Sequence, residues 1–199
     1  MTQDSNIGRG EQYHDRRAEI VTAAIGPAWL AAAHPDVARV TAMFAAADVP
    51  PYHVLSVRQA RGVLANVTRL QGPETPVAQV RALLVPDAAG ELPARVYHPA
   101  PGHELPLVVY LHGGGWTLGG LAEGDRPCRR LAVASGCVVV AVEYRRAPET
   151  KFPGPLDDCV QAVRWLAAHP DAVGADGEHV VLVGDSAGGN LAAATTLRL

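Results

Sequence analysis

The chain has 199 residues, of which 48% are hydrophobic and 19% are charged, and its formal net charge is −3. This length accommodates one large domain, or one domain with a small appendage, and is enough to bury a core of its own. The apolar content excludes an intrinsically disordered chain, and the slightly acidic balance argues against a nucleic-acid partner.

The N-terminus has no basic stretch followed by an apolar run, which argues against a secretory signal. The most apolar early segment, residues 20–33, is interrupted by a glycine and a proline. It is too short and too broken to span the roughly 30 Å hydrocarbon layer of a membrane. Three cysteines lack metal-ligand spacing and lie beside apolar residues, which predicts buried free thiols: Cys128, Cys137 and Cys159. We therefore expect a cytoplasmic protein.

The first zone of the chain is rich in alanine and predicts short amphipathic helices. Apolar side chains recur at helical spacing in residues 34–47 and again in residues 54–67, where Ser56 could cap the second helix. The proline pair in "DVPPYH" separates the two segments, because consecutive prolines cannot continue a helix. We expect an N-terminal helical region over residues 1–75, followed by a core domain over residues 76–199.

The pattern changes near residue 76. Residues 77–86 and 92–100 flank the turn signal "DAAGE" and predict two strands, an antiparallel pair at one edge of a sheet. Three later apolar runs lack polar alternation, which is typical of parallel strands covered on both faces. These runs are residues 105–112, 137–144 and 179–184.

Helices are expected between these strands. One should run from Asp125, as N-cap, to Ser135, where Gly136 stops it. A second covers "LDDCVQAVRWLAAH" and has one apolar face, and a third follows Ser186. This alternation predicts an α/β fold with a doubly wound, mostly parallel sheet.

The last predicted strand ends in Gly184-Asp185-Ser186-Ala187-Gly188, which fits the pattern G-x-S-x-G. In that pattern a sharp strand-to-helix turn exposes the serine hydroxyl, and the flanking glycines let strand and helix approach each other. The helix N-terminus supplies positive potential for a developing oxyanion. The alternative is a serine N-cap with two glycines fitting a tight turn.

A second motif, "LHGGGWTLGG", directly follows a predicted buried strand. Three successive glycines are a costly way to make an ordinary loop, because glycine loses the most backbone entropy on folding. Such a loop can turn backbone N–H groups inward, as an oxyanion hole requires. The alternatives are a phosphate-binding loop or a flexible turn, and the missing P-loop lysine argues against the first.

Four motifs follow one another in the chain: "HGGGW", "VEYRRAPE", "FPGPLDD" and "GDSAGGN". In this order they resemble the hormone-sensitive-lipase-like esterases of the α/β-hydrolase superfamily, also called the alpha/beta hydrolase fold-3 group. The resemblance covers roughly residues 50–199. It implies that the N-terminal helices contribute to a cap over an acyl pocket, and that short to medium acyl esters are hydrolysed without a metal or organic cofactor.

The resemblance also implies roles for individual residues. Ser186 would be the nucleophile, and the backbone N–H groups of Gly114, Gly115 and Ala187 would form the oxyanion hole. His112 would orient the glycine loop rather than act as a base.

Several neighbours of these motifs have other expected roles. Gly113 and Asp185 would support the loop and the turn, and Trp116 either lines the acyl pocket or packs beside the loop. A hydrogen-bonded turn network is expected for Tyr144, Arg145 and Glu149. Two features depart from the family pattern: Arg146 replaces the usual apolar residue, and Gly154-Pro155 replaces alanines.

The segment after Ser186, "AGGNLAAATTLRL", contains no Asp, Glu or His, and all eight histidines precede the serine. A serine hydroxyl needs a positioned base, itself oriented by a carboxylate. We therefore expect the N-terminal part of an α/β-hydrolase fold, truncated after the nucleophile helix and weak or inactive alone. Strand 180–183 would then be an exposed apolar edge. A non-catalytic small-molecule binding protein and a non-functional fragment are the alternatives, and a homo-oligomer stays open.

Overall fold

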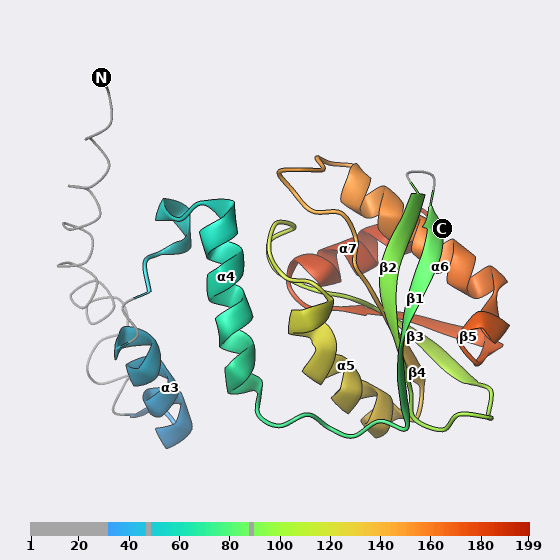
Figure 1. Cartoon of the computed structure of the whole chain (residues 1–199), viewed down its shortest axis with the longest axis horizontal. Helices are drawn as coiled ribbons and strands as arrows, with labels where there is room; N and C mark the ends of the chain where they lie inside the picture. Colours follow the sequence, from blue (N-terminus) through green and yellow to red (C-terminus); the bar gives the residue numbers. More distant parts are fainter. Residues whose placement is uncertain (1–31, 47–48, 88–89) are drawn as a thin grey trace. The chain divides into compact units, whose positions relative to one another are not determined.

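The computed structural model describes residues 32–46, 49–87 and 90–199 (Figure 1). Contacts divide the chain into two units, Met1–Ala60 and Arg61–Leu199, each described here by itself. The helical region predicted over residues 1–75 therefore contributes to both units. Most of the apolar segment 20–33 lies outside the described residues.

The first unit contains α3 (Pro35–Ala46), the short 3-10 helix η1 (Tyr52–Val54) and the beginning of α4 (Val57–Val67). The predicted cap of α4 is confirmed. The N–H of Ser56 donates to Gln59 Oε1 at 3.0 Å, and the N–H of Gln59 donates to Ser56 Oγ at 3.4 Å. This reciprocal pair is a capping box.

The second unit is built on a five-stranded sheet with the order β1-β2-β4-β3-β5. The strands are β1 (Gln79–Asp87), β2 (Gly90–His98), β3 (Leu105–Leu111), β4 (Val138–Val142) and β5 (Ala175–Gly184). β1 pairs antiparallel with β2 and β2 pairs antiparallel with β4, whereas β3 pairs parallel with both β4 and β5. The antiparallel edge pair and the parallel half of the sheet are as predicted.

Helices cover both faces of this sheet: α5 (Leu121–Ser135), α6 (Gly154–Ala168) and α7 (Ala187–Thr196). On one face Val109 and Val140 pack in a core with residues of α6 and α7. On the other face Tyr110 and Ala141 pack with Cys128 and other residues of α5. Alternate residues of β3 and β4 thus enter opposite cores, which confirms the doubly wound α/β arrangement.

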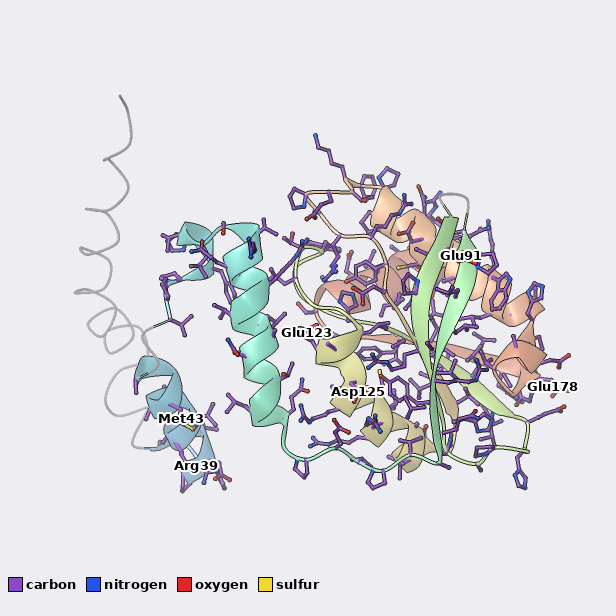
Figure 2. All side chains as sticks on the ribbon, in the orientation of Figure 1. Arg39, Met43, Glu91, Glu123, Asp125 and Glu178 are labelled. Carbon is purple, nitrogen blue, oxygen red and sulfur yellow. The ribbon has the colours of Figure 1, made fainter. Side chains whose placement is uncertain are left out.

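The start predicted for α5 is wrong. The helix begins at Leu121, four residues before Asp125, because Glu143, the residue directly after β4, accepts the Leu121 N–H on its Oε2 atom at 2.6 Å. Asp125 lies within the helix (Figure 2), where it accepts hydrogen bonds from Arg95 and Arg129. Arg95 is 30 residues away and Arg129 is one helical turn further on. The sequence around Asp125 therefore gives no sign of these partners, and Asp125 resembles a helix cap.

The starting point of α5 places Pro127 in the helix interior, where its missing N–H leaves the carbonyl of Glu123 without an intrahelical donor. The side-chain amide of Gln71 donates to that carbonyl at 3.1 Å. A residue from the preceding segment thus replaces the lost helical hydrogen bond.

β5 is less buried than its apolar run indicated. β4 is buried at every position, but β5 is only partly buried, and Val181 is 52% exposed. β5 pairs with β3 alone and lies at the sheet edge, as expected for residues 180–183.

The three cysteines carry free thiols. Cys128 and Cys159 are buried, which raises the pKa of both thiols, whereas Cys137 is partly exposed and departs from the predicted burial. No helix within the described ranges is long and apolar enough to cross a bilayer.

Candidate active site

Ser186 lies on the turn between β5 and α7, and its side chain is exposed. Its backbone has φ 49° and ψ −118°, a conformation that costs free energy in a residue with a Cβ atom. The Ser186 side chain makes no capping hydrogen bond to α7, so the interpretation as a simple serine N-cap is not supported. The geometry matches a turn that holds a serine hydroxyl out for reaction.

The two glycines of the G-x-S-x-G motif fill tight positions. A Cβ atom on Gly188 would overlap the carbonyl oxygen of Leu111, and one on Gly184 would overlap the backbone of Gly188. Strand, turn and helix therefore approach each other at a spacing that only glycine permits.

Asp185 connects the serine turn to the glycine loop that follows β3. Its Oδ1 atom accepts the N–H of Gly113 at 2.9 Å and the hydroxyl of Tyr110 at 2.7 Å. A Cβ atom on Gly113 would overlap the Asp185 carboxylate. The residue next to Ser186 is thus in direct contact with the first glycine of the loop.

The glycine loop has three successive residues with positive φ: Gly114 at 124°, Gly115 at 60° and Trp116 at 57°. It folds back on itself, since the N–H of Leu118 donates to the Gly114 carbonyl at 2.8 Å. Within the described part of the chain, the backbone N–H groups of Gly114, Gly115 and Ala187 donate no hydrogen bond. These donors are available to a bound oxygen.

His112 is buried beneath the loop, and burial lowers the pKa of its imidazole. Its Nδ1 atom lies 2.9 Å from the Gly113 carbonyl oxygen, and its ring stacks on that of Tyr144 at 4.2 Å between centroids. The Tyr144 hydroxyl in turn donates to the His112 carbonyl at 2.6 Å. These contacts involve Nδ1 and one face of the ring and place His112 against the glycine loop, whereas Nε2 is buried and has no hydrogen-bond partner.

An apolar cavity of about 350 Å³ lies against α7. Trp116 from the glycine loop, Phe152 from the segment before α6, and Leu191 from α7 contribute to its walls. Trp116 is 44% exposed, so its indole is available to a ligand. The cavity has room for an apolar group between the glycine loop and the side chains of Asn190 and Leu191 on α7.

The predicted turn network after β4 is confirmed in part. Arg145 pairs with the fully buried carboxylate of Asp158, which also accepts the Arg145 N–H at 2.8 Å. Glu149 pairs with Arg61, a partner that the sequence patterns did not indicate. Tyr144 joins His112 instead of either residue.

Two contributions to the site were missed at the level of sequence. Tyr110 interrupts an apolar buried strand, and a buried tyrosine hydroxyl needs a partner, so a signal for its bond to Asp185 was present. Arg61 had no such signal, because its contacts are to residues more than 50 positions away.

No described residue forms a hydrogen bond with the Ser186 hydroxyl. In the described ranges no group of three His, Cys, Asp or Glu side chains is arranged to hold a metal ion. The geometry therefore consists of an exposed serine, free backbone donors and an apolar cavity.

Residues 108–199 match the sequence profile of the alpha/beta hydrolase fold family. The chain is 44% identical over 108 residues to carboxylesterase NlhH of Mycobacterium tuberculosis, covering 54% of this chain and 34% of that protein. It is 39% identical over 125 residues to an arylesterase of Saccharolobus solfataricus, covering 63% of this chain and 41% of that protein.

Solved structures of esterases superpose on this chain. An esterase of Pyrobaculum calidifontis superposes with a TM-score of 0.70 at 42% identity, covering 72% of this chain and 48% of that one. An ester hydrolase from the metagenome of Lake Arreo gives a TM-score of 0.78 at 32% identity, covering 83% and 54%. The chain has the α/β-hydrolase fold, and the family match extends over its residues 108–199. It spans between about a third and two fifths of the length of these curated relatives and about half of these solved chains.

Proposed function

We propose that this chain carries the nucleophile and the oxyanion-binding loop of a carboxylic ester hydrolase. The observation that carries the proposal is the strained, exposed Ser186, joined through Asp185 to a loop with unused N–H groups. Relatives named as carboxylesterase and arylesterase support the same reaction class. The substrate is a small acyl ester, and no metal or organic cofactor takes part.

In the proposed reaction, Ser186 Oγ forms a bond to the acyl carbon, and the carbonyl electron pair moves onto the carbonyl oxygen. The N–H groups of Gly114, Gly115 and Ala187 receive that oxyanion, and the N-terminus of α7 adds positive potential. The bond to the alkoxy oxygen then breaks, and the alcohol leaves with a proton. Water attacks the acyl-serine and releases the carboxylic acid.

The supporting residues keep these groups in place. Asp185 fixes Gly113, and His112 lies against the Gly113 carbonyl beneath the loop. The acyl chain enters the apolar cavity beside Trp116 and Leu191, which favours short to medium chains.

No described residue forms a hydrogen bond with the Ser186 hydroxyl, so in the 199-residue chain we assign its proton to a base from solvent. A serine hydroxyl without a positioned base and acid is a weak nucleophile at neutral pH. We therefore expect slow, Ser186-dependent turnover. The cap formed by residues 1–75, a cytoplasmic location and a homo-oligomer remain predictions.

The proposal is tested by hydrolysis of p-nitrophenyl butyrate by the 199-residue chain and by its Ser186→Ala variant. The matched control is Ser135→Ala, which removes an exposed serine at the end of α5. We expect Ser135→Ala to keep the wild-type rate and Ser186→Ala to hydrolyse the ester more slowly than both. Equal rates for all three proteins would reject turnover through Ser186. Saturable ester binding with no turnover would instead favour a non-catalytic binding protein, and the absence of a cooperative thermal transition would favour a non-functional fragment.

A further inference from the structure

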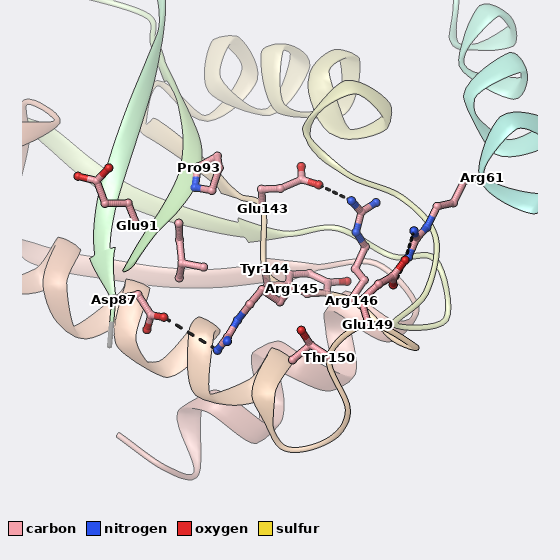
Figure 3. Close-up of a pocket in the computed structure, with 11 residues that line it drawn as sticks. Arg61, Asp87, Glu91, Pro93, Glu143, Tyr144, Arg145, Arg146, Glu149 and Thr150 are labelled. Atoms are coloured by element: carbon pink, nitrogen blue, oxygen red, sulfur yellow. Dashed lines mark hydrogen bonds and ion pairs between the residues drawn. The ribbon is translucent and has the colours of Figure 1, made fainter. Parts of the chain in front are cut away.

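A second cavity, of about 390 Å³, is lined mainly by charged side chains from four separate segments of the second unit (Figure 3). The ion pairs between its lining residues include Arg61 with Glu149 and Arg146 with Glu143. The proposed reaction uses neither pair. Both arginines, however, also donate to backbone carbonyls of the glycine loop.

Arg61 contacts the loop through a dense set of hydrogen bonds. Its Nε atom donates to the Thr117 carbonyl at 2.9 Å, and Nη2 donates to the Ala147 carbonyl at 3.1 Å. Its two terminal nitrogens bind the two oxygens of Glu149 at 2.7 and 2.8 Å. The planar fork of a guanidinium group makes this geometry possible, whereas a lysine could not reproduce it.

Arg146 contacts the loop two residues further on. Its Nη1 atom donates to the Gly119 carbonyl, and Nη2 lies 2.9 Å from Glu143 Oε1. The other oxygen of Glu143 accepts the Leu121 N–H that begins α5. A single arginine-glutamate pair therefore holds the end of the loop and the start of the next helix.

The segment between these anchors and Asp185 contains the three residues with positive φ. Asp185 fixes the N–H of Gly113 at one end, and the Ala147 N–H donates to the Trp116 carbonyl at 2.8 Å. The arginines then fix the carbonyls of Thr117 and Gly119. The side chains of Arg61 and Arg146, which line the charged cavity, thus bind carbonyl groups of the loop. The N–H groups of Gly114 and Gly115 stay free.

We propose that Arg61 and Arg146 are positioning residues that hold the glycine loop in the conformation competent to bind an oxyanion. The proposal rests on the esterase function proposed above. It assigns a role to Arg146, the residue that departs from the family pattern, and to Arg61, a residue preceding the core.

The test compares the variants Arg61→Ala, Arg61→Lys and Arg146→Leu with the matched control Arg164→Ala. Arg164 is an arginine of α6 whose side chain donates to the Arg198 carbonyl, away from the loop. The first measurement is hydrogen exchange of the loop amides that donate hydrogen bonds, with the amides of β3 and β4 as an internal reference. These loop amides are Gly113, Thr117, Leu118 and Leu121. We expect about tenfold faster exchange in the loop for Arg61→Ala and Arg146→Leu, unchanged exchange in the strands, and an intermediate result for Arg61→Lys.

The second measurement separates kcat from KM for p-nitrophenyl butyrate. Loss of oxyanion positioning should lower kcat by roughly 10- to 100-fold and leave KM within a factor of two. Loop exchange equal to wild type in Arg61→Ala and Arg146→Leu would overturn the proposal. So would faster exchange spread equally over loop and strands, because that result indicates general destabilisation. A wild-type chain without Ser186-dependent turnover would count against the esterase function alone, and loop exchange would still decide the role of the arginines.

Discussion

The serine turn and the glycine loop both hold residues at positive φ, but they are stabilised in different ways. The turn is held by backbone packing, since Gly184 and Gly188 permit contacts that any side chain would block. The loop is held by side chains from elsewhere, chiefly Asp185, Arg61 and Arg146. A strained conformation can therefore be specified by its own residues or imposed by distant ones, and the two cases should respond differently to substitution.

The largest effect is expected for Gly188→Ala in the serine turn. The new methyl group would overlap the Leu111 carbonyl oxygen, which belongs to a central strand and cannot move freely. We expect a loss of about 2–4 kcal/mol in the free energy of unfolding and no Ser186-dependent turnover. Urea denaturation and p-nitrophenyl butyrate hydrolysis measure the two effects.

The matched control for this substitution is Gly62→Ala in α4. Apart from its chain neighbours and the backbone of its own helix, no atom lies within 4 Å of a Cβ at Gly62, and its φ is not positive. The free energy of unfolding of this variant should rise by about 0.5–1 kcal/mol, because alanine restricts the unfolded chain and favours the helix. Equal stability of the two variants would contradict the packing described for the turn.

Strands β1 to β4, helix α6 and the serine turn could be predicted from the sequence because their signals are local. Apolar runs, helical spacing and the glycines around Ser186 each lie within about a dozen residues. Interactions between distant segments could not be predicted in this way. α5 begins at Leu121 because Glu143 accepts its N–H, and no pattern near residue 121 contains that information.

The difference in burial between β4 and β5 also depends on interactions between distant segments. Both have runs of valine, but β4 lies between two strands under helices, whereas β5 has a single neighbour. Burial depends on the position of a strand in the sheet as well as on its composition. In the site, the motif residues could be predicted, whereas Arg61 could not, because its partners are 56 to 88 residues away.

An intermediate effect is expected at Asp185, which joins the turn to the loop. Asp185→Ala leaves the Gly113 N–H and the Tyr110 hydroxyl without their acceptor, and we expect a loss of about 1–2 kcal/mol in the free energy of unfolding. Asp185→Asn keeps an acceptor oxygen, and its free energy of unfolding should fall by less than about 1 kcal/mol.

Tyr110→Phe provides the control for Asp185, since it removes one of the two donors and leaves the other in place. Tyr110→Phe should lose less free energy of unfolding than Asp185→Ala. Urea denaturation of the three variants ranks them. If Asp185→Ala proved as stable as wild type, the carboxylate would not be what holds the loop against the turn.

The smallest effect is expected from the pH dependence of the Arg61–Glu149 pair. Hydrogen bonds from Arg61, with help from the charge of Arg146, lower the pKa of Glu149 from 4.5 to about 2. Because the folded-state pKa is depressed, the contribution of the pair is complete above the ordinary value near 4.5 and is lost as the pH falls towards 2. The carboxylate is exposed, so the contribution to stability is small.

Glu149→Gln cannot titrate and serves as the reference for this measurement. We expect the hydrogen-bonded loop amides (Gly113, Thr117, Leu118 and Leu121) to exchange more slowly in wild type than in Glu149→Gln at pH 5 to 7, after correction for the intrinsic effect of pH on exchange. The difference should close as the pH falls from 4.5 towards 2, the range set by the shifted pKa. A difference that stayed constant down to pH 2 would show that the charge on Glu149 does not stabilise the loop. The conformation of the serine turn should not change over this pH range, because it depends on the packing of Gly184 and Gly188 and not on an ion pair.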